Sequence, residues 1–140
     1  MASVTPGRIL ITLGNMMYAL GAFAADFNTT HVFNPRWPPH AKFHNGQTMT
    51  LGILLSVTSL AFLWKSAHAR DVTRARESLW WAAMIGSFYC AAGCSAILYP
   101  GTEWTDPEFV VEGQWTQGSL FGGIVVAMWV GYALESWRLG

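Results

Sequence analysis

Charged side chains are scarce in this sequence. Only 11% of its 140 residues are Asp, Glu, Lys or Arg, whereas a typical soluble domain has about 25%. Basic and acidic residues balance, eight against eight, and there is no run of basic residues, which argues against a nucleic-acid partner. Hydrophobic residues reach 52% and include eight tryptophans, a composition that suits a bilayer and its interfaces.

Cysteine is also scarce. Cys90 and Cys94 are the only two, and their C-x-x-x-C spacing is neither a redox C-x-x-C nor half of a zinc site. In a helix the two thiols stack one turn apart. We interpret them as small packing residues.

Four long apolar stretches are present, at residues 9–25, 46–64, 79–99 and 115–134. Each is close to the roughly 20 residues that a helix needs to cross a ~30 Å hydrocarbon core. A soluble domain of this length could not bury four helices that lack a charged face. The sequence therefore predicts one all-α domain, residues 1–140, an integral membrane four-helix bundle. A cleaved signal peptide is the alternative for the first stretch, but Asn15 interrupts it.

The basic residues predict the orientation of the bundle. Four spans place both termini and the middle connection on one side, and that side carries six of the eight basic residues: Arg8, Lys65, Arg70, Arg74, Arg76 and Arg138. By the positive-inside rule this side is cytoplasmic. The first and third connections then form two polar loops on the non-cytoplasmic face. We predict a location in the endoplasmic reticulum membrane.

Small residues recur within the spans and predict close helix contacts. Gly86 to Gly93 and Gly118-x-x-x-Gly122 are the clearest cases. The same small-residue faces could also support a homo-oligomer.

The first polar loop gathers residues capable of acid/base chemistry. A helix that starts at Pro38 and Pro39 would place His40, His44 and Gln47 on one face, at i, i+4 and i+7. Asp26, at the end of the first span, would face them and act as a general acid. The candidate catalytic residues of this loop are Asp26, His31, His40 and His44. The alternative is an ordinary interfacial loop anchored in the headgroups.

The second polar loop adds four acids. Glu103 and Glu112 lie close to the spans, so we expect one of them to contact the first loop in preference to Asp106 or Glu108. Glu103 and Glu112 are therefore the remaining candidate catalytic residues. An equally good interpretation is that one of them forms a structural ion pair with Arg36 or Lys42.

Amides and aromatic residues near the same face are candidates for substrate binding. They are Asn15, Tyr18, Asn28, Asn34, Trp37, Gln47, Trp104 and Trp115. Asn15 lies within a span and needs a hydrogen-bond partner, for which Tyr18, Thr48, Thr50, Tyr89 or a substrate would serve. Trp37 and Trp104 could stabilise developing positive charge through their ring faces.

A metal site is a minority alternative. His40 and His44 have a helical ligand spacing, and His31 and Asp26 could complete a shell for zinc or iron. The chain has no H-E-x-x-H motif and no nucleotide-binding motif. The main prediction therefore includes neither a metal nor a cofactor.

The strings HVFNPRWPPHAKFHNGQ (31–47) and YPGTEWTDPE (99–108) resemble small four-span membrane proteins of fungi. In general design the chain is also similar to emopamil-binding-type sterol isomerases and membrane-bound meroterpenoid cyclases, families that protonate lipophilic substrates with acids at the end of a helical bundle. It has fewer spans, and no motif of theirs matches residue by residue, so the likeness assigns no residue.

These observations predict an acid/base isomerase or cyclase that acts on a lipophilic, terpenoid- or polyketide-like molecule from the bilayer. One alternative is a non-enzymatic lipid-binding or accessory subunit, and another is a small transporter. A compact transferase similar to the glutathione-dependent eicosanoid enzymes is a further one.

Overall fold

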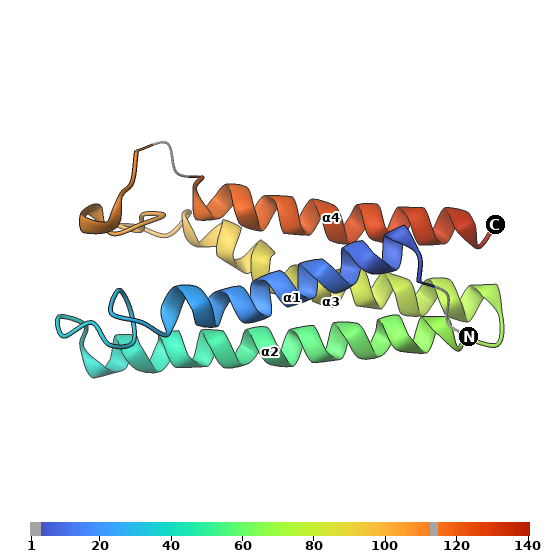
Figure 1. Ribbon diagram of the computed structural model, residues 1–140, viewed down its shortest axis with the longest axis horizontal. Coiled ribbons are helices and arrows are strands. Elements are labelled where there is room, and N and C mark those ends of the chain that lie inside the picture. The colour runs from blue at the N-terminus through green and yellow to red at the C-terminus, as the bar shows by residue number, and fades with distance from the viewer. Residues whose placement is uncertain (1–3, 113–114) are drawn as a thin grey trace.

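The computed structural model describes residues 4–112 and 115–140, which are all-helical apart from their connections. The elements are α1 (Pro6–Asp26), α2 (Pro39–Ala67), α3 (Val72–Ala96), a short 3-10 helix η1 (Pro107–Phe109) and α4 (Gln117–Arg138). Figure 1 shows the four long helices lying side by side. Both termini and the α2–α3 connection lie at one end, here called the terminal end. The connections 27–38 and 97–112 lie at the other, the loop end.

Each long helix packs against two neighbours. α1 contacts α2 and α4, α3 contacts α2 and α4, and α1 also reaches α3 across the bundle. The core contains Ile11, Leu79 and Met128, all fully buried, surrounded by small residues. Small side chains let the helices approach closely where van der Waals contact provides the attraction.

The closest approach joins α1 to α4. A Cβ atom on Gly7 would lie 2.5 Å from the carbonyl oxygen of Gly131, and one on Gly131 would lie 2.8 Å from that of Gly7. Both obstacles are backbone atoms, which cannot rotate away. Only glycine fits at these two positions.

The glycine contacts predicted from the sequence are mostly confirmed. Gly86 lies against Ser59 and Met128, Gly93 against Phe121, and Gly118 against Trp104. The prediction is wrong at Gly122, where a Cβ would meet none of the described residues within 4 Å. Gly122 lies on a face of α4 that packs against no neighbour, which a sequence spacing alone cannot distinguish from the packed face.

The helix ends follow local chemistry. α1 starts at Pro6 and α2 at Pro39, because proline fits the first turn of a helix. The carboxylate of Asp71 caps α3 by accepting a hydrogen bond from the backbone N of Arg74, and Thr116 caps α4 in the same way through Ser119. α1 and α2 extend past their predicted apolar stretches at both ends, since helical hydrogen bonding continues into polar sequence. α3 begins seven residues before its stretch, at Val72, and ends three residues earlier, at Ala96, whereas α4 begins two residues later and ends four residues later.

Three of the described helices, α1, α2 and α4, are long and apolar enough to cross a membrane. α3 is as long, but it begins with a polar turn that holds Arg74, Arg76 and Glu77 and continues with serines and glycines. Large apolar side chains cover the outside of the bundle; Leu54 is 59% exposed and Val126 is 62% exposed. This arrangement is compatible with an integral membrane protein, since lipid can cover such a surface.

Candidate functional site

Asp26 organises the loop end of the bundle. It is the last residue of α1, and its Oδ2 accepts a 2.8 Å hydrogen bond from Nδ2 of Asn45 on α2. Its Oδ1 lies 3.9 Å from Nε2 of His31 in the α1–α2 connection. Asp26 is 16% exposed and His31 is 35% exposed. The acid and one of the predicted histidines therefore form a half-buried pair.

The hydrogen bonds around His31 define its tautomer. Asn28 Oδ1 accepts from both the backbone N (2.8 Å) and the hydroxyl (2.6 Å) of Thr30. The hydroxyl has given its only proton to Asn28, so it must accept at its 2.6 Å contact with His31 Nδ1. In this arrangement Nδ1 of His31 carries a proton, and Nε2 faces Asp26.

Asn28 and Asn34 hold the loop in shape. The Asn28 amide nitrogen bonds to the last carbonyls of α1, at Ala24 and Ala25. Asn34 is buried, donates to the carbonyl of Thr30 and accepts from the backbone N of Arg36. These contacts position His31 and give both amides partners within the chain.

His40, His44 and Gln47 share one face of α2, as the spacing predicts. The Nε2 atoms of His40 and His44 are 3.0 Å apart, and His44 Nδ1 lies 3.2 Å from Gln47 Oε1. Since the Gln47 oxygen can only accept, His44 donates from Nδ1, and a neutral His44 accepts from His40 at Nε2. All three side chains are exposed. They form a second polar group. Among the described residues, no hydrogen bond or ion pair joins this group to Asp26.

The two connections meet through a residue that sequence reasoning ranked low. Arg36 of the first connection forms an ion pair with Glu108, at the 3-10 helix η1. The expectation that Glu103 or Glu112 would make this contact is wrong. Both are exposed. Glu108, at η1, forms the ion pair with the first connection instead.

Three aromatic candidates lie in different surroundings. Trp37 packs edge-to-face on His31, with ring centroids 4.9 Å apart. Trp104 lies against Gly118 at the start of α4. Trp115 is 83% exposed, so its ring is directed away from the bundle.

Asn15 and Tyr18 belong to a polar network in the middle of the core. Tyr18 donates a 2.8 Å hydrogen bond to Asn15 Oδ1, and Asn15 Nδ2 donates to Ser59 of α2 at 2.9 Å. Ser59 donates in turn to the carbonyl of Ala82 on α3 at 2.7 Å. Tyr18 was among the predicted partners of Asn15, whereas Ser59 was missed. The sequence feature that could have identified Ser59 is its hydroxyl inside an apolar stretch. Ser56 and Thr58 offer the same feature nearby.

A second charged cluster, at the terminal end, was not predicted as a site. Glu135 of α4 is 1% exposed, and its Oε2 lies 3.3 Å from Arg8 Nε and 3.0 Å from an Arg138 nitrogen. Its Oε1 accepts a hydrogen bond from Thr5. The sequence signal was a single acid at the end of an uncharged stretch with basic residues at both ends of the chain.

Comparison with known proteins identifies a family. One family model, described as a family of unknown function, DUF6640, matches residues 10–140. The chain belongs to DUF6640. No curated protein and no solved structure matches it.

The DUF6640 match includes the whole loop-end group, together with Glu135 and Arg138, and begins just after Arg8. Within the described part of this DUF6640 chain, no group of three or more His, Cys, Asp or Glu side chains could hold a metal ion. Instead of forming one shell, the four predicted ligands fall into two pairs, Asp26 with His31 and His40 with His44.

Proposed function

We propose that this protein is a four-span membrane protein with its loop end on the non-cytoplasmic side, in the endoplasmic reticulum. The supporting observation for the fourth span is the position of α3, a 25-residue helix packed between α2 and α4. Six of the eight basic residues lie at the terminal end, which favours cytoplasmic termini.

Its proposed activity is the acid/base isomerisation or cyclisation of a lipophilic, terpenoid- or polyketide-like molecule. The observation that carries this proposal is the Asp26–His31 pair, 3.9 Å apart and half-buried at the end of α1. A carboxylate beside an imidazole whose facing nitrogen exchanges a proton is suited to general acid and base steps.

In this proposal His31 delivers a proton from Nε2 to a carbon of an alkene, and Asp26 balances the charge of the imidazolium. Asn45 and Thr30 hold the two groups in place through the hydrogen bonds described above. The Trp37 ring, in contact with His31, is placed to stabilise a developing carbocation. A base then removes a proton from a neighbouring carbon, so that the substrate is rearranged without redox change.

The test compares membranes of a host that lacks the gene with membranes restored by single variants. The isolated membranes are incubated in D₂O with a lipophilic extract of the host that lacks the gene, and the products are profiled, because protonation on carbon introduces solvent deuterium into the product. We expect Asp26→Asn and His31→Gln to lose the labelled product by about 100-fold or more, within the range for general acid–base catalysis. His68→Gln is the matched control, since His68 is an exposed histidine outside the loop end.

Full product formation by both variants, at wild-type expression, would refute the site. Unlabelled product, or no change on deletion, would refute the enzyme and favour a non-enzymatic accessory role.

A further inference from the structure

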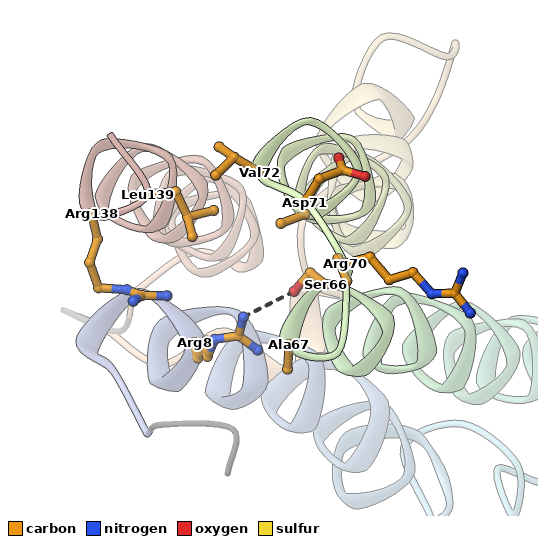
Figure 2. A pocket seen from close by; sticks show the side chains of 10 residues that line it. Arg8, Ser66, Ala67, Arg70, Asp71, Val72, Arg138 and Leu139 are labelled. Atoms are coloured by element: carbon orange, nitrogen blue, oxygen red, sulfur yellow. Dashed lines mark hydrogen bonds between the residues drawn. The ribbon is translucent and has the colours of Figure 1, made fainter.

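Two cavities adjoin among residues of the terminal end, which lies at the opposite end of the bundle from the loop end (Figure 1). The first has a volume of about 340 Å³. It lies between the starts of α1 and α3 and the C-terminal ends of α2 and α4. Its lining includes Arg8, Ser66 and Arg138. Figure 2 shows the Arg138 guanidinium directed toward Arg8, whose own guanidinium is turned toward Ser66, while Arg70 points away from both.

The second cavity is an apolar groove on the outside of the bundle between α1 and α2. Its volume is about 560 Å³, and its walls include Ile9, Leu13, Leu60 and Trp64. Both volumes fall in the range of about 300–1,000 Å³ typical of ligand sites. Arg8 and Ala67 line both cavities. The polar cavity and the apolar groove therefore share part of their walls.

The polar cavity has positive charge to offer a ligand. Arg8 and Arg138 share one carboxylate, that of Glu135. Among the described residues that line the cavity, Asp71 is the one acid, and it is already bound to the backbone N and the side chain of Arg74. Arg8 also donates to the Leu63 carbonyl and to Ser66. A guanidinium has more N–H donors than these contacts use, and its fork suits a phosphate.

We propose that these two cavities form one site for an anionic phospholipid of the leaflet at the terminal end. The phosphate binds between Arg8 and Arg138, next to Ser66, and one acyl chain lies in the groove between α1 and α2. An anionic phospholipid fits both parts. Its phosphate is attracted to the cationic cavity, and its acyl chain suits the apolar groove on the outer surface of the bundle. Basic pockets between helices at the cytoplasmic side of a membrane bind anionic headgroups in this way. This site does not depend on the activity proposed for the loop end.

Arginines at a membrane interface also anchor a helix without any specific lipid, and the experiment must separate the two roles. Native mass spectrometry of the full chain in detergent would measure binding of palmitoyl-oleoyl-phosphatidylglycerol and of the phosphatidylcholine with the same chains. We expect the anionic lipid to bind at least about tenfold more tightly. Arg138→Gln should weaken it about tenfold, the loss expected for one charged hydrogen bond.

Lys65→Gln is the matched control, because it removes a positive charge from the same end of the bundle, at an exposed residue that lines neither cavity. Its affinity should stay within about twofold of wild type, since salt screens charges at a distance on the surface. A second variant pair tests the groove. Thr12→Trp places an indole in the groove and should weaken binding, whereas Thr58→Trp, at an exposed threonine that does not line the groove, should not.

Equal affinity for the two lipids would overturn the proposal, as would equal weakening by Arg138→Gln and Lys65→Gln. Glycerol phosphate and inorganic phosphate form the third arm. If they bind as tightly as the lipid and Thr12→Trp has no effect, the site holds a soluble phosphate and the lipid assignment is wrong.

Discussion

The carboxylate of Glu135 lies 3.3 Å from the guanidinium of Arg8 and connects the end of α4 to the start of α1. Arg138, one turn further along α4, binds the same oxygen. A buried carboxylate needs such partners, because transferring a charge out of water costs several kcal/mol. The cluster therefore couples two helices that are widely separated in the sequence.

Replacing Glu135 should destabilise the bundle strongly. Glu135→Leu leaves Arg8, which is 13% exposed, without its counter-charge, and breaking a buried pair costs about 3 kcal/mol or more. The thermal midpoint in detergent should fall by several degrees, whereas Glu77→Leu, at an exposed acid of the same end, should change it little. An unchanged midpoint for Glu135→Leu would show that the cluster does not hold α1 to α4.

A single methyl group should separate α1 from α4. Gly131→Ala places a Cβ 2.8 Å from the Gly7 carbonyl oxygen, and overpacking of this kind costs about 1–3 kcal/mol. Gly123→Ala, on the same helix, meets none of the described residues within 4 Å and should be tolerated. The two melting curves give the answer directly. Equal midpoints would mean that the helices are not packed backbone to backbone.

The two connections of the loop end should be joinable by a short chemical cross-link. Arg36 and Glu108 form an ion pair, so cysteines at these positions in a background of Cys90→Ala and Cys94→Ala should react with one short bis-maleimide. Mass spectrometry of the digested protein would detect the linked peptides. The pair at positions 36 and 103 is the control and should link less efficiently. Preferential linking of the control would place Glu103, as the sequence suggested, against the first loop.

The fourth span can be tested by labelling from one side. In the same cysteine-free background, Ala69→Cys in the α2–α3 connection and Thr102→Cys after α3 should react with an impermeant maleimide from opposite sides of sealed vesicles. Ala69→Cys should be reached from the cytoplasmic side. Labelling of both from one side would exclude a membrane-crossing α3.

The sequence predicts the regular parts of this molecule well. The ranges of the four helices follow from long apolar runs, and the His40–His44–Gln47 face follows from the period of the helix started by Pro39. Among the four long helices, α3 is the one whose composition does not identify it as a membrane span. Its charged first turn and small polar residues lower its hydropathy, so that composition distinguishes it from α1, α2 and α4.

The contacts between separate elements were harder to predict. Asn45, which binds Asp26, is next to His44 in sequence but points toward α1, and that direction depends on how the two helices pack. Glu108, at η1, contacts Arg36. Irregular loops have no repeating side-chain pattern, so the sequence could not predict which acid of the second loop makes this contact. The buried state of Glu135 depends on Arg8, which only the folded bundle brings near it.

The contact between Gly7 and Gly131 has a consequence for how the protein is made. A ribosome synthesises α1 long before α4, so a nascent chain with only α1, α2 and α3 has no partner yet for the Gly7 backbone or for the carboxylate-binding side of Arg8. The bundle is completed when α4 arrives and supplies Gly131 and Glu135 together. The contact between α1 and α4 therefore forms only after α4 is made, whereas α1, α2 and α3 can pack against one another before it.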